Sequence, residues 1–330
     1  MTQDRHRNRT RARARARPFL TAVTAIALSY ATAPAQQEKL PTIRRTHYGV
    51  PHILADDFHG IGLGLGYAQV EDYGARVVLR LVRARGELGR SFGRDSMESD
   101  FRARLIHQRA VATYHLLDAD TRGMLEGFAE GVNLYIRSHP DQFGVWARPN
   151  FTGHDVAALD IGTANLGAAQ RVVQRELQRG GITESGDHAI REPRSGILDP
   201  RSEEGSNAWA FAPSRTKSGR AILLRNPHLA WDAGYWEAHV TIPGVLNFYG
   251  DFRIGGPFGV IGGFNQHLGW STTNNAPDND EVYALDLHPW YPNHYWFDGA
   301  VVPMRREDVL VDYRTNDGIG HETRTFWSTP

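Results

Sequence analysis

The feature that most constrains the fold is a change of sequence pattern at residues 180–205. Before this stretch, apolar residues recur at helical spacing; after it, short apolar runs are separated by turn residues, as in strands. The stretch itself is rich in glycine, proline, serine and mixed charges, and it cannot bury enough apolar surface to offset the entropy lost on ordering. The sequence therefore predicts an α+β protein with a helix-rich first segment and a strand-rich second segment.

The helix-rich segment follows a short extended stretch from Thr42 to Ala55. Asp56 and Asp57 then offer N-caps for a long helix, because a short acidic side chain accepts hydrogen bonds from the first free N–H groups. Further helices are expected over Phe101 to Leu117, over Thr121 to Arg137, and from a cap at Asp155 through Leu166.

Glycines are concentrated in two of these helices. Between positions 60 and 66, every second residue is glycine, which does not match the G-x-G-x-x-G spacing of a dinucleotide-binding loop. Gly127 and Gly131 lie four residues apart and so share one face of their helix. We expect both sets to allow close helix packing.

Charge and cysteine content exclude several classes of partner and site. The 37 basic and 37 acidic residues balance, so no global field favours nucleic acid or an anionic membrane. Without cysteine, disulfides, thiolate zinc sites and a cysteine nucleophile are excluded.

Residues 1–35 combine an arginine-rich head, a short apolar stretch and Ala33-Pro34-Ala35. This order is typical of a secretory signal peptide cleaved after Ala35, with a disordered basic tail as the alternative.

The strand-rich segment contains apolar runs over 208–212, 221–224, 236–242 and 246–249. Ser218-Gly219, between the first two runs, predicts a hairpin turn. Continuously apolar strands are usual in sheets covered on both faces. We therefore expect a sheet layered between helices.

A spaced set of motifs begins at Ser206. Ser206-Asn207-x-Trp209 is followed by Asn226-Pro227-His228, Gly263-Phe264-Asn265 and Trp270. Together with Tyr48-Gly49-Val50-Pro51-His52-Ile53, this set resembles the penicillin acylase family, and the resemblance covers nearly all of residues 42–330. It implies an N-terminal-nucleophile hydrolase with a four-layer αββα sandwich, incomplete in this chain, and a helix-rich N-terminal segment.

The resemblance also divides the chain, because such enzymes cut their own precursor just before a serine. It implies a signal peptide at 1–35, a small α chain at 36–182, an excised linker at 183–205 and the N-terminal part of the catalytic β chain at 206–330. A long surface loop is the alternative for the linker, although a structureless loop of this length is unusual in a compact domain. The product would be two chains from one precursor.

Ser206 is the expected nucleophile. A serine hydroxyl needs a base, and neither a G-x-S-x-G elbow nor an S-x-x-K motif surrounds Ser206. Released at a chain terminus, the serine has its own base, because a free α-amine has a pKa of about 7.7 to 8.0. The α-amine and hydroxyl of Ser206 would then form the catalytic pair.

His228 and Asn274 complete the catalytic set that the resemblance implies. The subgroup of acyl-homoserine lactone, aculeacin and cephalosporin acylases has histidine at the position of His228, which would hold the amine and hydroxyl of the serine; a histidine satisfied within the sheet is the alternative. Asn274 would supply the first oxyanion donor through its backbone N–H. The family's second donor is an asparagine further downstream, so we expect this sequence to be a fragment or a truncated product.

Asp278-Asn279-Asp280-Glu281 gathers oxygen ligands of the kind that calcium prefers. Some penicillin acylases hold a structural calcium in this region, and Asp278 and Glu281 fall on the matching positions; a solvated acidic turn is the alternative. The spacing is not that of an EF-hand, and no H-E-x-x-H motif supports a zinc hydrolase. No cofactor is expected to be required for catalysis.

The sequence thus predicts a periplasmic or secreted amidohydrolase that deacylates a small N-acyl amide through an acyl-serine intermediate, with neither nucleic acid nor membrane as a partner. Acyl-homoserine lactones compete with β-lactam and lipopeptide side chains as the substrate. The apolar candidates for an acyl pocket are Leu229, Trp231, Phe258 and Val260. The alternative is a truncated, catalytically inactive periplasmic remnant. Strands without their partners leave open edges, so residues 36–330 alone are expected to be inactive and poorly soluble.

Overall fold

The structure, a computed structural model, describes residues 40–161, 174, 206–228, 234–258, 262–273 and 283–329. All of them belong to one unit, Lys39–Pro330. The predicted signal peptide at 1–35 and the predicted linker at 183–205 lie outside the described residues. Within the described ranges, no helix is long and apolar enough to cross a membrane.

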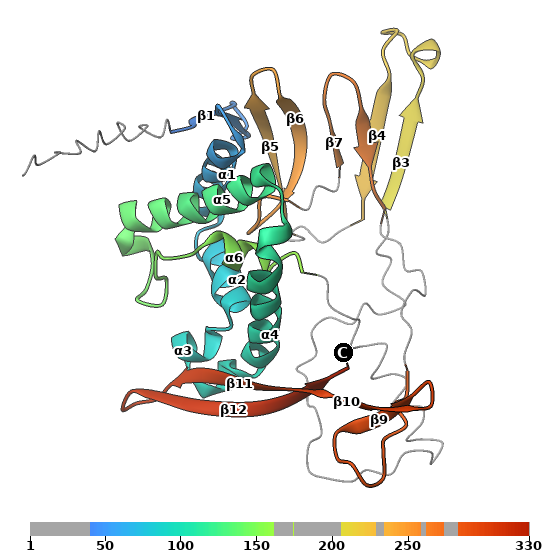
Figure 1. Cartoon of the computed structure of the whole chain (residues 1–330). Helices are drawn as coiled ribbons and strands as arrows, with labels where there is room; N and C mark the ends of the chain where they lie inside the picture. The colour runs from blue at the N-terminus through green and yellow to red at the C-terminus, as the bar shows by residue number, and fades with distance from the viewer. Residues whose placement is uncertain are drawn as a thin grey trace, which may run out of the picture. The chain divides into compact units, whose positions relative to one another are not determined.

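Helices make up most of the first segment, as the periodicity predicts (Figure 1). The first helix is capped by Asp57, whose carboxylate accepts a hydrogen bond from the N–H of Gly60 at 2.7 Å. The helices are α1 (Phe58–Tyr73), α2 (Ala75–Arg85), α3 (Leu88–Phe92), α4 (Glu98–Thr113), α5 (Ala119–Ser138) and α6 (Gly153–Ala157), with 3-10 turns η1 (Arg94–Ser96), η2 (Tyr114–Leu116) and η3 (Pro140–Gln142).

Three predicted helix boundaries are wrong. The long helix expected after Asp57 is two helices, because Gly74 adopts a positive φ of 49° and ends α1. Asp155 does not cap α6: Thr152 is the N-cap, and Asp155 is the third helical residue of its capping box. Both residue types accept hydrogen bonds from free N–H groups, so the sequence alone does not separate them. The expected continuation to Leu166 is also wrong, because α6 ends at Ala157 and residues 158–161 are described as non-helical; residues 162–166 lie outside the described residues.

Glycine lets α1 and α5 pack backbone to backbone, as predicted. A Cβ placed on Gly127 of α5 would lie 2.0 Å from the carbonyl oxygen of His59. A Cβ placed on Gly131 of α5 or on Gly62 of α1 would likewise lie 2.1 or 2.2 Å from a backbone oxygen. The predicted close approach of these helices is confirmed, and it depends on the absence of side chains at these positions.

One six-stranded sheet joins the two segments. Its strands, in spatial order, are β1 (Thr42–Arg45), β2 (Pro51–Leu54), β5 (Tyr235–Ile242), β6 (Leu246–Arg253), β7 (Gly262–Phe264) and β8 (Gly269–Ser271). β2 pairs in parallel with β5, and the other neighbours are antiparallel. The first segment therefore supplies one edge of the sheet, and the second segment supplies the rest.

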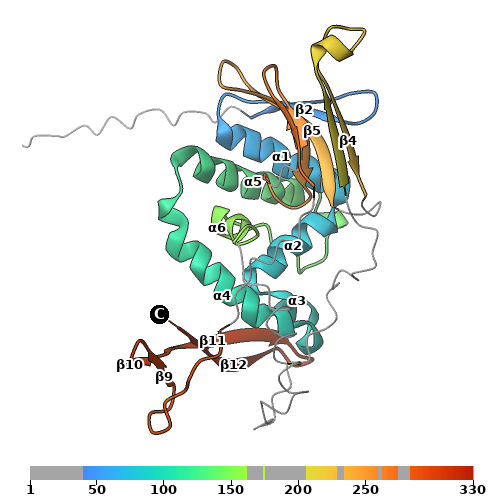
Figure 2. The same ribbon diagram turned by 90° about the vertical axis from the view of Figure 1, so that its right-hand side faces the viewer.

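Helix α1 covers one face of this sheet, with α5 packed against it (Figure 2). Burial along β5 alternates: every second residue is buried, and Glu237, His239 and Thr241 between them are exposed or half-buried. Alternation is the pattern of a strand covered on one face. The continuously apolar pattern on which the expectation of a sheet layered between helices was based is therefore not found in β5.

The remaining described strands form three hairpins: β3 (Ser206–Phe211) with β4 (Ile222–Pro227), β9 (His294–Phe297) with β10 (Ala300–Pro303), and β11 (Arg305–Arg314) with β12 (Ile319–Ser328). The strands predicted on both sides of Ser218-Gly219 are confirmed. Their connection is longer than a two-residue turn, since it covers 212–221 and contains the 3-10 turn η4 (Pro213–Arg215). Gly219 has the positive φ, 67°, that a turn here requires.

The β11–β12 hairpin packs on α3 and α4 of the first segment (Figures 1 and 2). Arg324 of β12 makes two hydrogen bonds with the carboxylate of Glu98, at 2.7 and 3.0 Å, and lies over the ring of Phe101 at 4.1 Å. Beneath these charges is a small apolar cluster of Met97, Phe101, Val309 and Val311. The last described strands are thus attached to the helical segment by apolar and ionic contacts together.

The main hydrophobic core takes side chains from α1, α2 and α5 of the first segment and from β5 and β6 of the second. A buried glutamine crosses the same boundary: the amide of Gln69 donates to the carbonyl oxygen of Gly256 at 3.1 Å and accepts from the N–H of Gly255 at 2.7 Å. The indole N–H of Trp236 also donates to Asp72, at 2.7 Å. The two segments therefore share one core, with its buried polar groups paired across the boundary.

Replacing Gly127 with alanine should lower the free energy of unfolding by at least about 1–3 kcal/mol, the usual cost of overpacking a core, because α1 and α5 must separate. Gly123 is the matched control on the same helix, since a Cβ there would meet nothing closer than 3.5 Å. Gly123→Ala should be neutral or slightly stabilising through the helix propensity of alanine. Urea denaturation of both variants measures the difference, and equal stabilities would contradict the described packing.

Candidate functional site

Two motifs of the second segment meet at the open end of one hairpin: Ser206 and Asn226-Pro227-His228. Ser206 is the first residue of β3 and pairs in register with Pro227, the last residue of β4. His228 follows directly and is exposed, whereas Ser206 is half-buried and is the only residue of β3 that is not exposed. The structure therefore brings the predicted nucleophile and the predicted histidine to the same end of the β3–β4 hairpin.

Asn226 contacts the ring of His228. Its side-chain amide nitrogen lies 3.1 Å from Nε2 of the histidine. Because an amide N–H can only donate, Nε2 accepts, and the neutral imidazole then carries its proton on Nδ1. His228 lies beyond the end of β4, so it is not a residue within the six-stranded sheet.

Most of the other predicted site residues lie outside the described residues: Asn274, Asp278, Glu281, Leu229, Trp231 and Val260. Their roles stay predictions. Phe258 is described; it is half-buried, packs against the main core, and accepts a hydrogen bond at its carbonyl oxygen from the N–H of Arg253 at 3.1 Å. Over the described residues, no three His, Asp or Glu side chains gather as a metal site.

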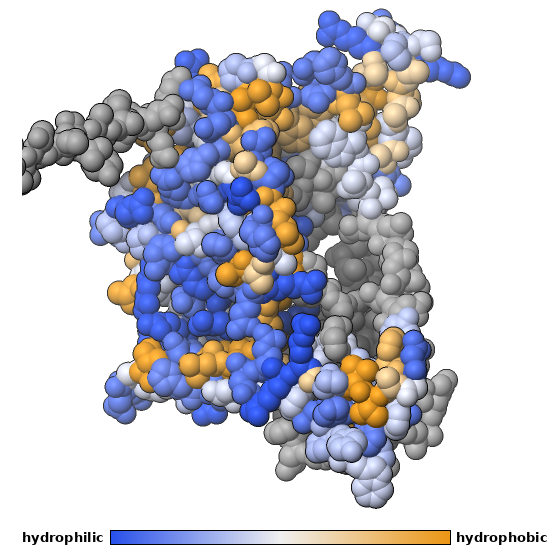
Figure 3. All heavy atoms as spheres, viewed as in Figure 1, coloured by the Kyte–Doolittle hydropathy of each residue, from blue (hydrophilic) through white to orange (hydrophobic). Residues whose placement is uncertain are grey.

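The β3–β4 hairpin buries little apolar surface. Trp209 and Phe211 of β3 pair with Leu224 and Ile222 of β4, and between 43% and 50% of each residue is exposed. Figure 3 shows apolar residues gathered on this hairpin, at the upper right of the view. The hairpin therefore depends on contacts outside its own strands for a fixed position.

An arginine that the sequence analysis did not single out links this hairpin to the sheet. Arg225 of β4 forms an ion pair with Asp251 of β6, and its Nε donates to the hydroxyl of Ser271 of β8 at 3.3 Å. Asp251 is only 8% exposed. No local pattern signals such a pair, because the two residues become neighbours only when the hairpin meets the sheet.

A second buried ion pair lies in the helical segment. Asp155 accepts hydrogen bonds from Arg85 at 2.9 and 2.5 Å, and Nε2 of His107 lies 2.9 Å from the same carboxylate. Burial alone would raise the pKa of Asp155, but the hydrogen bonds from Arg85 and His107 outweigh it and hold the pKa well below its usual range. This carboxylate joins α2, α4 and α6, and its role is structural.

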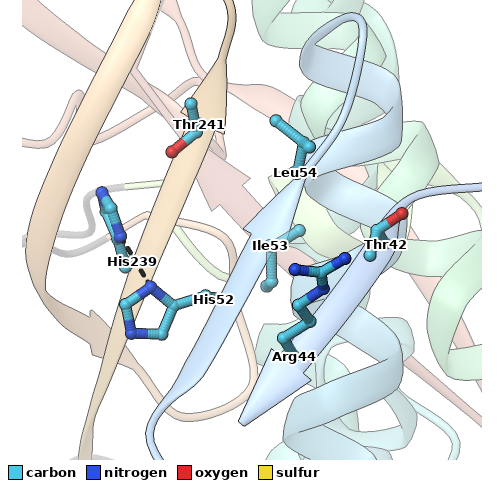
Figure 4. A pocket seen from close by; sticks show the side chains of 7 residues that line it. All are labelled: Thr42, Arg44, His52, Ile53, Leu54, His239 and Thr241. Carbon is cyan, nitrogen blue, oxygen red and sulfur yellow. Dashed lines mark hydrogen bonds between the residues drawn. The ribbon is translucent and has the colours of Figure 1, made fainter. Parts of the chain in front are cut away.

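An open pocket of about 290 Å³ lies on β1, β2 and β5. At its wall, His52 and His239 face each other from neighbouring strands, with their Nδ1 atoms 2.8 Å apart (Figure 4). Nε2 of His239 lies 2.6 Å from Oδ1 of Asn247 and so donates to it, which leaves Nδ1 of the neutral ring to accept from His52. These strands lie toward the sheet edge opposite β8, so the pocket is separate from the end of the hairpin that carries Ser206.

Asp155→Asn should lower the free energy of unfolding by about 3–5 kcal/mol near neutral pH, as is usual when one partner of a buried ion pair is removed. Because the folded-state pKa is lowered, the stability from this carboxylate is present above the unfolded pKa of about 3.9 and is lost as pH falls through the folded value. The wild type should therefore lose more stability on acidification below about pH 5 than Asp155→Asn does.

Urea denaturation over this pH range measures the effect. Asp141→Asn, at an exposed position of η3, is the control, and its free energy of unfolding should depend on pH as that of the wild type does. If the free energy of unfolding fell by the same amount on acidification in the wild type and in Asp155→Asn, the lowered pKa of Asp155 would be contradicted.

The chain matches the family described as penicillin amidase over residues 41–330. It is 33% identical to an acyl-homoserine lactone acylase, PvdQ, of Pseudomonas fluorescens Pf-5, over 93% of this chain and 43% of that protein. It is 30% identical to the aculeacin-A acylase of Actinoplanes utahensis, over 87% of this chain and 39% of that protein. The chain thus spans less than half the length of these curated relatives.

Among solved structures, the thermostable penicillin G acylase from Alcaligenes faecalis in tetragonal form is similar to this chain. The match covers 47% of this chain and 100% of that chain, at 21% sequence identity and a TM-score of 0.32.

Proposed function

The chain belongs to the penicillin amidase family, and we propose that it carries the nucleophile of a self-processing amidohydrolase that deacylates small N-acyl amides. The observation that carries this proposal is the position of Ser206 at the start of β3, with His228 at the same open end of the hairpin. A serine that serves as both nucleophile and base needs its hydroxyl and its α-amine at one accessible point. The first residue of a strand at the open end of a hairpin meets that need.

The first proposed reaction is hydrolysis of the chain's own Gly205–Ser206 bond. One water is consumed, the α-amine of Ser206 is freed, and a carboxylate is left on Gly205. The sheet and the main core support this step, because they take residues from both sides of the cut. The two products would therefore stay together as one folded unit.

In the proposed turnover, the hydroxyl of Ser206 attacks the carbonyl carbon of the substrate amide, and its proton passes to the α-amine. The α-amine donates this proton to the leaving nitrogen as the C–N bond breaks, and the acyl group remains as an ester on Ser206. Water, losing a proton to the same amine, attacks the ester and releases a carboxylic acid and the free serine. An α-amine suits this work because its unperturbed pKa of about 7.7 to 8.0 lies close to neutral pH.

Three further residues have a role in this proposal. His228 holds the α-amine and the hydroxyl of Ser206 by hydrogen bonding, and Asn226 restrains its ring through the 3.1 Å contact. The backbone N–H of Asn274 is assigned as the first donor to the oxyanion of the tetrahedral intermediate. Loss of one such donor typically costs about 10²–10³ in turnover.

The names of the relatives suggest the class of substrate. One is called an acyl-homoserine lactone acylase and another an aculeacin-A acylase. We therefore assign N-acyl amides as substrates, with acyl-homoserine lactones and lipopeptide or β-lactam side chains as the candidates, and Phe258 together with Leu229, Trp231 and Val260 as the acyl pocket. Export through residues 1–35 and a structural calcium on Asp278 and Glu281 belong to the same proposal.

Expressed from its complete gene, the protein should yield a chain that begins with Ser206-Asn207-Ala208-Trp209 and a smaller chain that begins near Gln36. N-terminal sequencing and intact mass measure both. Ser206→Ala should remain a single uncut chain after signal removal, because it lacks the attacking hydroxyl. Ser218→Ala, in the connection of the same hairpin, should be cut like the wild type. An uncut wild type that hydrolyses amides would exclude the mechanism, and an uncut, inactive one would favour the inactive remnant.

Acetylating the α-amine of Ser206 in the cut protein should abolish turnover while the far-ultraviolet circular dichroism stays unchanged. In the unmodified protein, the rate should rise with a single ionisation as pH increases, because only the unprotonated amine accepts the proton of the hydroxyl. Activity that survives complete blocking of the terminus would identify His228 as the base instead.

A further inference from the structure

We propose that Arg225 is a positioning residue for Ser206 and His228: its ion pair with Asp251 fixes the β3–β4 hairpin on the six-stranded sheet. This inference rests on the proposed function, because it concerns the same nucleophile. It adds a residue that touches neither substrate nor the reacting atoms and acts through the strand that it holds.

The position of Arg225 in the hairpin couples it to both catalytic candidates. It lies three residues before His228 on β4, and it pairs in register with Ala208, two residues after Ser206 on β3. A strand advances by about 3.3 Å for each residue, so Arg225 lies within about 10 Å of the open end along both strands. A shift of the backbone at Arg225 therefore moves the nucleophile and the histidine together.

Apolar packing does little to hold the hairpin. Apart from Ser206, every residue of β3 is exposed, and on β4 only Leu223 and Arg225 are half-buried. Leu223 lies beside Gly269 of β8, where a Cβ would meet its side chain at 3.3 Å. An isolated two-stranded hairpin is marginally stable in water, so the placement of this one depends strongly on Arg225.

The six-stranded sheet offers Arg225 a site of matching charge and shape. Asp251 on β6 lies directly opposite Glu237 on β5, which places two carboxylates on neighbouring strands, and Arg225 supplies the opposite charge. Ser271 accepts a hydrogen bond from Nε of the arginine at 3.3 Å. At Gly262 a Cβ would come within 2.5 Å of the same nitrogen, so glycine leaves the space that the guanidinium fills. Charge, hydrogen bonding and shape all match one arginine here.

Loss of the ion pair between Arg225 and Asp251 should slow the reactions more than it weakens substrate binding. A misplacement of about 1 Å at a reacting group costs on the order of 10²-fold in rate. In the complete gene product, Arg225→Ala should therefore slow self-cleavage and lower kcat by about 10- to 100-fold, with little change in KM. Arg220→Ala, at an exposed position of the same hairpin, is the control and should behave like the wild type.

A double variant separates positioning from simple charge balance. Arg225→Ala leaves the buried carboxylate of Asp251 unpaired, which by itself destabilises the fold. Arg225→Ala/Asp251→Asn removes that unpaired charge and should recover the free energy of unfolding, but not the rates, if Arg225 positions the hairpin. Recovery of self-cleavage and kcat together with stability would overturn the proposal.

Hydrogen–deuterium exchange gives a readout that does not depend on activity. Amides of residues 207–211 should exchange faster in Arg225→Ala and in the double variant than in the wild type or Arg220→Ala. Unchanged exchange in these strands would overturn the inference even if the wild type neither cuts itself nor hydrolyses amides. That inactive wild type would count against the proposed function and not against the anchoring of the hairpin.

Discussion

The parallel pairing of β2 with β5 is the contact on which the rest of the structure depends. It places His52, Ile53 and Leu54 beside residues far along the chain and makes one sheet from two segments. Parallel neighbours cannot be joined by a tight turn, so the chain between them must cross over, and here the crossing includes α1 to α6. Helix α1 then lies on the sheet, and the glycines of α1 and α5 bring the second helix close behind it.

This arrangement would let the chain keep its fold after the proposed excision of residues 183–205. The proposed cut at Gly205–Ser206 falls within the crossover connection. The pairing of β2 with β5 and the buried hydrogen bonds of Gln69 join the two sides of this cut without a covalent bond, so the cut leaves them in place. Hydrophobic stabilisation is roughly proportional to the apolar area removed from water, and it does not require that the packed groups belong to one chain. The proposed new terminus at Ser206 would lie on a lightly packed hairpin, which the ion pair of Arg225 with Asp251 links to the six-stranded sheet.

The sequence predicted the parts of this fold that local pattern controls. Helical periodicity, the cap at Asp57, and the close packing allowed by Gly127 and Gly131 are confirmed. The motifs also predicted the family, and membership of that family confirms the N-terminal-nucleophile hydrolase fold class. The break at Gly74 was missed because a single glycine inside a periodic stretch is compatible with a continuous helix.

Interactions between distant residues were not predictable in the same way. Asp155 fits a helix cap by sequence, yet its carboxylate also binds Arg85, seventy positions away. Arg225 and Asp251 lie on different sheets of the fold, and only the docking of the β3–β4 hairpin pairs them. The signal peptide, the excised linker, the calcium site and the oxyanion donor at Asn274 fall outside the described residues and stay predictions.

Native mass spectrometry of the protein after the proposed self-cleavage tests most directly whether residues on both sides of the cut build one core. We expect a one-to-one complex of the two chains under native conditions, which separates only when denaturant unfolds both together. Two chains that part without denaturant, while each keeps its secondary structure, would contradict this expectation.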